Sequence, residues 1–77
     1  MGSANLIMQY LCDNQRHLIC KPYSIPNLHK MAEDLKIKRC WFHSPDHYDI
    51  PKRRLEEIKQ ECKVITTKEI INIINNK

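Results

Sequence analysis

The sequence predicts a small α/β domain, in which a single-layer sheet with partly parallel strands packs against about three helices. Three observations lead to this prediction. Short apolar runs alternate with longer amphipathic segments, the longer segments start with residues that favour helix starts, and 77 residues provide for one hydrophobic core only. The expected order of elements is β-β-α-β-α-β-α.

The expected strands are short apolar runs bounded by polar residues, a pattern that favours buried strands over helices. They cover 5–12 (NLIMQYLC), 17–20 (HLIC), 39–42 (RCWF) and 63–66 (KVIT). The segments between strands at 12–16 (CDNQR) and 43–50 (HSPDHYDI) are expected to be loops. Because ligands bind at the carboxyl ends of the strands in α/β sheets, we expect both loops at the same edge.

The clearest helix is expected over 24–38 (SIPNLHKMAEDLKIK). Ser24 is a favourable N-cap, and Pro26 is tolerated in the first turn because its missing N–H is not needed there. The apolar residues recur at the helical period and fall on one face, which comprises Ile25, Leu28, Met31, Ala32 and Leu35.

Two further helices are expected in the second half of the chain. One covers 51–62 and begins at Pro51, a residue that fits the first turn of a helix. The other covers 67–77, and Thr66 with Glu69 forms the capping-box pattern that marks its start. The residues of 51–62 that are expected to face inward are Leu55, Ile58 and Cys62.

The composition is that of an ordinary globular protein with a mild excess of positive charge. Thirteen Lys and Arg residues against nine Asp and Glu residues give a net charge of +4 and a pI near 9.0, which favours an anionic partner. The only glycine is Gly2, which excludes glycine-rich phosphate loops of the Walker and dinucleotide-binding types. The four cysteines lie in apolar runs and are expected to be reduced and structural.

The ends and the length of the chain lead to three further expectations. Residues 1–4 (MGSA) resemble a cloning scar, which leaves a single domain over 5–77. No apolar run is long enough to cross a membrane and no signal-peptide pattern is present, so we expect a cytoplasmic protein without a membrane partner. A chain this small buries a limited fraction of its surface, so we expect a homo-oligomer.

The stretch CWFHSPDHYDIPKRR concentrates the residues that carry chemistry, and metal binding is the first interpretation. Cys40, His43 and His47 have the spacing C-x2-H-x3-H, which combines the sulfur and imidazole ligands that zinc prefers, and Asp49 could add an oxygen. However, no second ligand pair is present, and on a strand Cys40 would face the core together with Phe42. We therefore expect no metal and no cofactor.

Acid–base chemistry is the second interpretation. A carboxylate can orient a histidine for proton transfer, and His47 with Asp49, or His17 with Asp13, would suit this role. His29, at the rim of the buried face of the first helix, is a further candidate acid or base. No glycine-flanked serine or cysteine nucleophile is present, and carboxylates are few for metal-assisted phosphodiester cleavage. These absences make a binding protein the preferred interpretation over an enzyme.

Anion binding is the third interpretation, and the one that we prefer. The helix N-terminus expected at Pro51 would offer free N–H groups to a phosphate. The three bases at 52–54 would lie in its first turn, where they oppose the helix dipole unless a negative ligand compensates them. Trp41 and Tyr48 offer aromatic faces on which a base could stack.

The segments LHKMAEDL, CWF and HYDIPKRR together resemble a family of small domains of unknown function, family 4031 (DUF4031), which occurs in bacteria and their phages. The family pattern starts with Y-x-x-D and continues with H-L, L-H and a small residue, W-F, then H-Y-D followed by K-R. The matching positions are Tyr10, Asp13, His17, Leu18, Leu28, His29, Ala32, Trp41, Phe42, His47, Tyr48, Asp49, Lys52 and Arg53.

This resemblance covers about residues 8–72, and H-Y-D after W-F is its most specific part. Two departures stand out: the loop after Asp13 is shorter than in the family, and Glu61 and Cys62 replace a Gly-Ala pair. The resemblance implies a set of site positions rather than a reaction. By analogy with other small phage proteins, it suggests a binder that sequesters a molecule of the host's defence.

The leading hypothesis is a small domain that binds an anionic small molecule, either a nucleotide or a nucleotide-derived signal. Lys52 and Arg53 would hold its phosphate groups. The residues expected to bind it are Asp13, His17, His29, Trp41, His47, Tyr48, Asp49, Lys52 and Arg53.

Two alternatives stay open. The first is an enzyme that acts on a phosphate ester or a nucleotide through His47 and Asp49, with His29 as a further candidate catalytic residue. The second is a nucleic-acid-binding protein, although no recognition-helix pattern or RNA-binding aromatic motif supports it.

Overall fold

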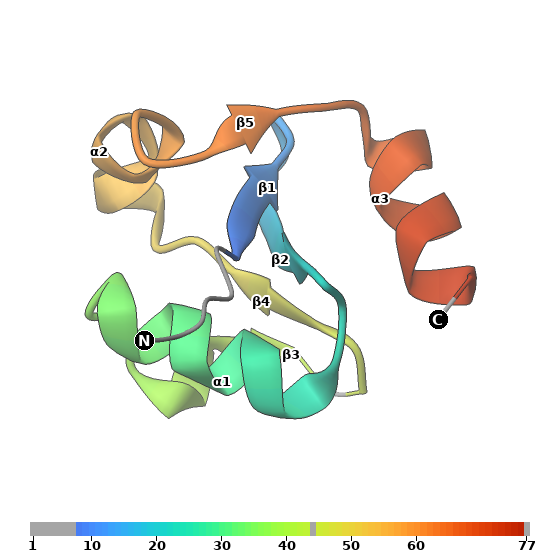
Figure 1. The fold of residues 1–77 in the computed structure, drawn as a ribbon. Coiled ribbons are helices and arrows are strands. Elements are labelled where there is room, and N and C mark those ends of the chain that lie inside the picture. Colours follow the sequence, from blue (N-terminus) through green and yellow to red (C-terminus); the bar gives the residue numbers. More distant parts are fainter. Residues whose placement is uncertain (1–7, 44, 77) are drawn as a thin grey trace, which may run out of the picture.

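The computed structural model describes residues 8–43 and 45–76. The expected scar at 1–4 and the first residues of the strand over 5–12 lie outside this part of the chain. Within it, the structure confirms a small α/β domain with a five-stranded mixed sheet and three α-helices (Figure 1). The elements are β1 (Gln9–Cys12), β2 (His17–Lys21), α1 (Ile25–Asp34), β3 (Phe42–His43), β4 (His47–Asp49), α2 (Leu55–Lys59), β5 (Lys63–Val64) and α3 (Thr67–Asn75), with 3-10 turns η2 (Arg39–Trp41) and η3 (Lys52–Arg54).

The strands are arranged in the order β3-β4-β2-β1-β5. Only β1 and β5 pair in parallel; the other neighbours are antiparallel. Because β2 and β4 run antiparallel, the loop at 13–16 meets the end of β4, and the Ile50 N–H donates to the Arg16 carbonyl oxygen at 2.8 Å. The expectation that both loops lie at the same edge of the sheet is therefore met only in part. Only the end of segment 43–50 reaches the loop at 13–16.

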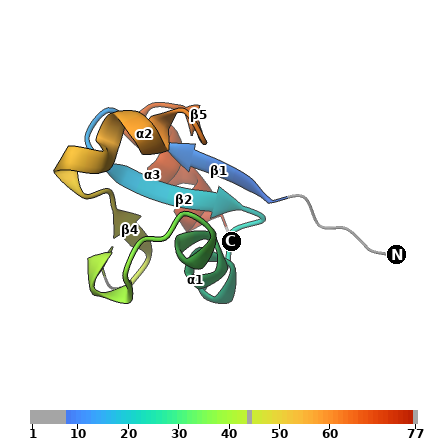
Figure 2. The same cartoon turned by 90° about the vertical axis from the view of Figure 1, so that its left-hand side faces the viewer.

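Helices cover both faces of the sheet. Figures 1 and 2 show α1 on one side and α3 on the other, and β2 is buried on both faces as a result. Its residues Leu18, Ile19 and Cys20 are 0% exposed. The buried hydrophobic residues form one core, which comprises Leu11, Cys12, Leu18, Ile19, Cys20, Leu28, Met31, Ala32, Leu35, Ile37, Tyr48, Ile50, Ile58, Ile70 and Ile74.

Both ends of α1 follow from local sequence. The Ser24 hydroxyl accepts a hydrogen bond from the Asn27 N–H at 3.1 Å, as expected for an N-cap. At the other end, Lys36 adopts the left-handed conformation with φ of 59°. Its N–H donates to the Glu33 carbonyl oxygen, and the next N–H, of Ile37, donates to that of Ala32. This is the Schellman pattern that ends many helices.

The capping box predicted at the start of α3 is confirmed. The Thr66 hydroxyl accepts from the Glu69 N–H at 3.1 Å, and the Glu69 carboxylate accepts from the Thr66 N–H at 3.0 Å.

No helix in the described ranges combines the length and the apolar character that a membrane crossing requires.

Two segments around the functional stretch differ from the prediction. The expected strand at 39–42 is mostly the turn η2, so Cys40 is exposed rather than buried. The expected loop at 43–50 contains β4, which pairs with β3 and with β2. The second difference follows from burial: Tyr48 and Ile50 alternate with His47 and Asp49 and are 1% and 0% exposed, as expected for a strand with one buried face.

The expected helix at 51–62 is also shorter than predicted. It begins as the turn η3, and α2 covers only Leu55–Lys59. The Arg54 guanidinium donates to the carbonyl oxygens of Leu35 and Lys36 at 2.9 and 2.8 Å. These bonds tie η3 to the end of α1, where a cation complements the negative end of the helix dipole.

Candidate functional site

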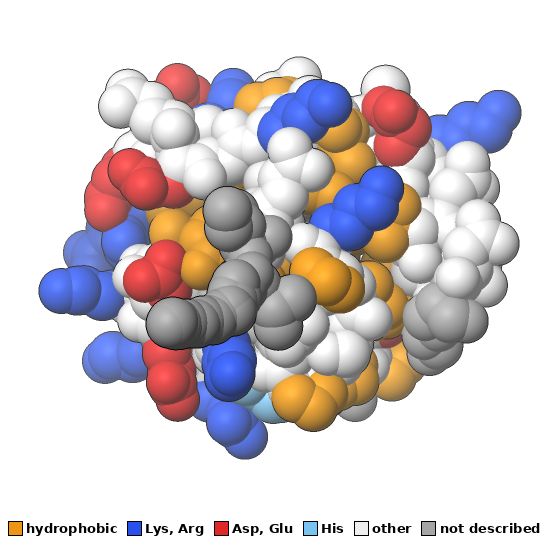
Figure 3. Space-filling model, viewed as in Figure 1, with side chains coloured by type: hydrophobic (Ala, Val, Ile, Leu, Met, Phe, Trp, Pro, Cys, Tyr) orange, Lys and Arg blue, Asp and Glu red, His pale blue; other side chains and the backbone are white. Residues whose placement is uncertain are grey.

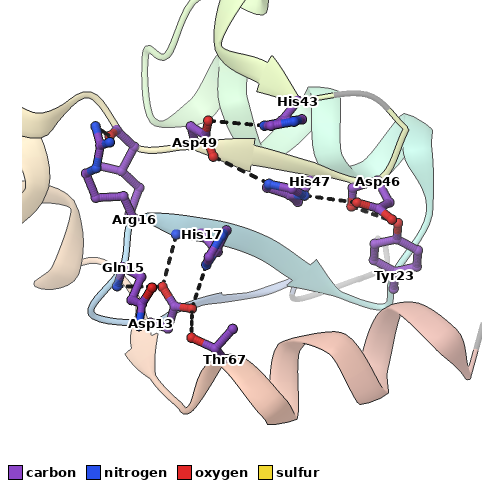
Figure 4. Close-up of polar contacts among 11 residues, drawn as sticks. Asp13, Gln15, Arg16, His17, Tyr23, His43, Asp46, His47, Asp49 and Thr67 are labelled. Atoms are coloured by element: carbon purple, nitrogen blue, oxygen red, sulfur yellow. Dashed lines mark hydrogen bonds and ion pairs between the residues drawn. The ribbon is translucent and has the colours of Figure 1, made fainter.

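The alternation of side chains along β4 determines which residues can form a site. His47 and Asp49 point to one face of the sheet and Tyr48 points to the other. Asp49 lies opposite His17 on β2, and His47 lies opposite His43 on β3. Three histidines and one aspartate from three strands therefore share one face, and the close-up in Figure 4 shows them together.

Asp13 and His17 form an oriented pair at the edge of this face. Asp13 is 1% exposed, and its carboxylate accepts hydrogen bonds from the backbone N–H groups of Gln15 and His17 and from the Thr67 hydroxyl. Nδ1 of His17 lies 2.8 Å from the same carboxylate (Figure 4). An ionised Asp13 therefore holds the Nδ1 proton of His17 and leaves Nε2 as the acceptor.

The hydrogen bonds also determine the charge of this buried carboxyl. Burial alone would raise the pKa of Asp13, but hydrogen bonds from the Thr67 hydroxyl and from His17 outweigh burial and hold the pKa below its usual value. Asp13 is therefore ionised at neutral pH and acts on His17 as a fixed negative charge.

A second histidine, His47, lies between two carboxylates. Its Nδ1 is 2.9 Å from an oxygen of Asp46, and its Nε2 is 3.4 Å from an oxygen of Asp49. The other Asp49 oxygen is 3.4 Å from Nδ1 of His43. The rings of His43 and His47 stack, with centroids 4.9 Å apart. Figure 4 shows Asp46, His47 and Asp49 in succession along and next to β4, with His43 on the neighbouring strand β3.

The two histidine groups, Asp13 with His17 and His43 with Asp46, His47 and Asp49, meet beside α3. The rings of His17 and His47 lie edge to face, with centroids 5.1 Å apart. They line one end of a cavity of about 250 Å³, together with Asp46 and Thr67. Its other wall is apolar and consists of Ile70, Ile71 and Ile74 of α3, with Asn75 at the end.

Tyr48 and His29 lie on the opposite face of the sheet, away from His47 and Asp49. Nδ1 of His29 is 2.7 Å from the hydroxyl of Tyr48, and the His29 ring packs against Phe42. Burial raises the pKa of Tyr48, so its hydroxyl stays protonated. The hydroxyl of Tyr48 is already hydrogen-bonded and its ring is buried, so the contacts of both side chains in this structure join α1 to the hairpin of β3 and β4.

A basic cavity of about 460 Å³ lies between the end of α1 and η3. Five of the eight residues that line it are basic, and none of these eight described residues is acidic. The lining residues are Lys36, Ile37, Lys38, Trp41, Pro51, Lys52, Arg53 and Arg54. In Figure 3, Lys and Arg side chains gather at the left-hand edge, where α2 and the end of α1 lie, with acidic side chains among them.

The basic side chains of this cavity differ in their hydrogen-bond and ion-pair partners. Arg54 is bound to Glu57 and to the end of α1. By contrast, the side chains of Lys36, Lys38, Lys52 and Arg53 form no hydrogen bond or ion pair with any residue of the described ranges. The α-helix N-terminus expected at Pro51 is not formed there, because Lys52–Arg54 is the turn η3 and the five-residue helix α2 begins only at Leu55.

Trp41 connects the basic cavity with the histidine groups. It is 37% exposed and lines the basic cavity. It also lines a shallow depression of about 500 Å³ that contains Cys40, Phe42, His43 and Asp49. A ligand in the basic cavity can therefore extend across the Trp41 ring towards Asp49.

Four residues of these groups were not predicted from the sequence. Lys36 and Lys38 flank the buried Ile37, and this alternation was a usable signal. Asp46, next to His47 in the sequence, was another. Thr67 gave no signal, because it lies 54 residues from Asp13 along the chain.

Comparisons with known proteins identify a family and no individual relative. No curated protein and no solved structure gives a significant match to the chain. A family model matches residues 8–77, and its description is "Protein of unknown function (DUF4031)". The match spans nearly the whole chain and includes every residue of the two histidine groups and of the basic cavity. The chain thus belongs to the DUF4031 family.

Proposed function

We propose that the protein binds an anionic small molecule of the nucleotide class, with its phosphate groups in the basic cavity. One observation carries the proposal: Lys36, Lys38, Lys52 and Arg53 converge on one cavity without an acidic partner among the described residues. The volume of about 460 Å³ is in the range of small-molecule sites.

Electrostatics favours an anion in this place. Like charges that share a concave surface repel one another, and the neighbouring low-dielectric wall strengthens their field. A phosphate group would replace this repulsion by attraction. Arg53 can offer two parallel N–H donors to phosphate oxygens, and Lys52 contributes a point charge.

The apolar part of the cavity favours a ligand that also carries a flat ring. The buried residues Ile37 and Pro51 also line this cavity, and the exposed Trp41 offers a stacking surface of the kind that binds nucleobases. On the far side of Trp41, the Asp49 carboxylate, 37% exposed, can accept hydrogen bonds from sugar hydroxyls. Phosphate, ring and hydroxyls together describe a nucleotide.

Calorimetric titration with adenosine and guanosine phosphates and with tripolyphosphate tests this proposal. We expect the double variant Lys52→Ala/Arg53→Ala to weaken binding at least about tenfold, which corresponds to about 1.4 kcal/mol. The matched control is Lys30→Ala/Lys68→Ala, which makes the same change in net charge at exposed positions outside the cavity. Equal affinities for parent, double variant and control would refute the role of the cavity.

By analogy with other small phage proteins, we propose that binding serves to sequester a host signal. Native mass spectrometry of the purified protein, before and after denaturation, reports the bound mass and the oligomeric state together. An intact ligand of nucleotide mass that is released on denaturation supports sequestration. The mass of the native complex shows whether the protein that binds it is the expected homo-oligomer or a monomer. If nucleic acid binds instead, its affinity will fall steeply with salt concentration.

An enzyme acting on a phosphate ester is the second candidate function. The observation that favours it is the meeting of His17 and His47, each oriented by its own carboxylate, at one end of a cavity. Such pairs suit general acid–base catalysis. Ligand recovered as product after incubation would establish turnover, and we expect His17→Gln to abolish it. Ligand recovered intact leaves binding as the function.

A further inference from the structure

We propose that His43, His47 and Asp49 form a binding site for a divalent transition-metal ion of the zinc class. The site lies beside the basic cavity, and binding of the metal does not depend on a nucleotide. The metal site considered from the sequence comprised Cys40, His43 and His47, with Asp49 as a possible further ligand; the proposed site excludes Cys40 and makes Asp49 the third ligand.

The spacing of the ligand atoms suits such an ion. One nitrogen of each histidine and one oxygen of Asp49 lie within 4.8 Å of one another. The two distances from Asp49 oxygens, to Nδ1 of His43 and to Nε2 of His47, are both 3.4 Å. Metal–ligand bonds of about 2.0–2.2 Å in a tetrahedral shell place neighbouring ligand atoms about 3.3–3.6 Å apart. The two distances involve different oxygens of Asp49, so the side chains would have to rotate to bring one oxygen and the two nitrogens onto one ion.

The hydrogen bond of His47 to Asp46 fixes which ring nitrogen faces the site. When Nδ1–H donates to the Asp46 carboxylate, the lone pair of Nε2 points at the carboxylate of Asp49, 3.4 Å away. Two acceptors then face each other, and a cation between them converts this repulsion into attraction. A carboxylate that binds the second nitrogen of a metal-ligating histidine is the usual outer-shell arrangement.

The stacked rings of His43 and His47 bring both histidines within reach of one ion. Their centroids lie 4.9 Å apart, and one nitrogen of each ring lies within 4.8 Å of an Asp49 oxygen. A single divalent ion can take one nitrogen from each ring and the negative charge of Asp49. Nitrogen and oxygen ligands of this kind select zinc, cobalt or nickel over magnesium or calcium.

The exposure of the three side chains suggests an open coordination shell. His43 is 62% exposed and Asp49 is 37% exposed, whereas His47 is 17% exposed and anchors the site. Three protein ligands and a free position are typical of catalytic rather than structural zinc sites. His43 and Asp49 both line the depression next to Trp41, so a phosphate group or a water molecule could reach a bound ion from there.

Titration of chelator-treated protein with zinc chloride and with cobalt chloride tests the site. We expect one equivalent to bind and cobalt to give the intense visible absorption of a tetrahedral site. His43→Ala is expected to weaken zinc binding at least about 100-fold; because this side chain is largely exposed, its loss does not threaten the fold. Asp46→Asn is expected to weaken it about 10- to 100-fold through the orientation of His47.

Cys40→Ser separates the two possible ligand sets. We expect this variant to bind zinc like the parent, because Cys40 is not among the clustered ligand atoms. Circular dichroism of each variant verifies the fold. The proposal is overturned if the parent binds no metal, if His43→Ala and Asp46→Asn bind as tightly as the parent, or if Cys40→Ser abolishes binding. None of these results depends on whether a nucleotide binds.

Discussion

The two faces of β4 differ sharply, although they arise from three consecutive residues. On the face towards α1, Tyr48 is 1% exposed and its hydroxyl is hydrogen-bonded to His29. On the other face, His47 and Asp49 are partly exposed, and each lies within 3.4 Å of another titratable group. The alternation of side chains along one short strand therefore separates a buried residue of the core from two partly exposed residues of the candidate site.

This comparison shows why adjacent residues of one motif need not share a function. The H-Y-D motif appears as a single unit in the sequence, yet its central residue helps to form the core. Its outer residues are held apart from the core by the alternation of the strand. Substitutions of Tyr48 should therefore affect mainly stability, and substitutions of His47 and Asp49 mainly binding.

The largest expected effect contrasts Tyr48→Ala with Asp49→Ala. Removing the buried ring of Tyr48 should lower the free energy of unfolding by about 3–5 kcal/mol, as for other large aromatic truncations. Removing the partly exposed carboxylate of Asp49 should change it by less than about 0.5 kcal/mol. Denaturant unfolding measures both, and similar losses for the two variants would break the contrast between the faces.

The next effect concerns Asp13, the buried carboxylate that binds Nδ1 of His17 on the partly exposed face. We expect Asp13→Asn to lower stability at pH 7 by about 2 kcal/mol, because buried donors lose a charged acceptor. The folded pKa of Asp13 is lowered, so its contribution is present above the unfolded value of about 3.9 and is lost as the pH falls through the folded pKa.

The difference between parent and Asp13→Asn should therefore shrink on acidification below about pH 4. Thermal unfolding followed from pH 7 to pH 2 measures it. The exposed Glu61→Gln serves as a control and should follow the parent throughout. A difference that stays constant over this pH range would contradict the ionised state of Asp13.

The smallest effect comes from Tyr48→Phe. This change keeps the buried ring but removes the hydroxyl that lies 2.7 Å from His29. We expect a loss of about 1 kcal/mol in stability, the typical contribution of one hydrogen bond. Ligand and metal binding should stay at the level of the parent; weaker binding would show that the two faces of β4 are coupled.

How much the sequence could predict depended on the range of the interactions. The N-cap of Ser24 and the capping box of Thr66 are local, so both helix starts were predicted correctly. Strand β4 was predicted as a loop because its three residues are held by partners on β2 and β3 rather than by local propensity. The alternation of polar and apolar residues in HYDI was the available signal.

The candidate site was predicted in its residue types but not in its grouping. The pairing of Asp13 with His17 followed from short spacing in the sequence. The grouping of Lys52 and Arg53 with Lys36 and Lys38 did not follow from the sequence, because Arg54 joins η3 to the end of α1 across 18 and 19 residues of chain. Contacts between segments that are distant in the chain decide which charges converge.

The fluorescence of Trp41 provides the most direct test of the central claim, that an anionic ligand occupies the basic cavity. Trp41 is the only tryptophan of the chain and lines this cavity. We predict that tripolyphosphate and nucleoside triphosphates change its emission in a saturable way, and that Lys52→Ala/Arg53→Ala removes this change while Lys30→Ala/Lys68→Ala retains it. Emission that no phosphate compound alters, or that changes equally in both double variants, would contradict the account.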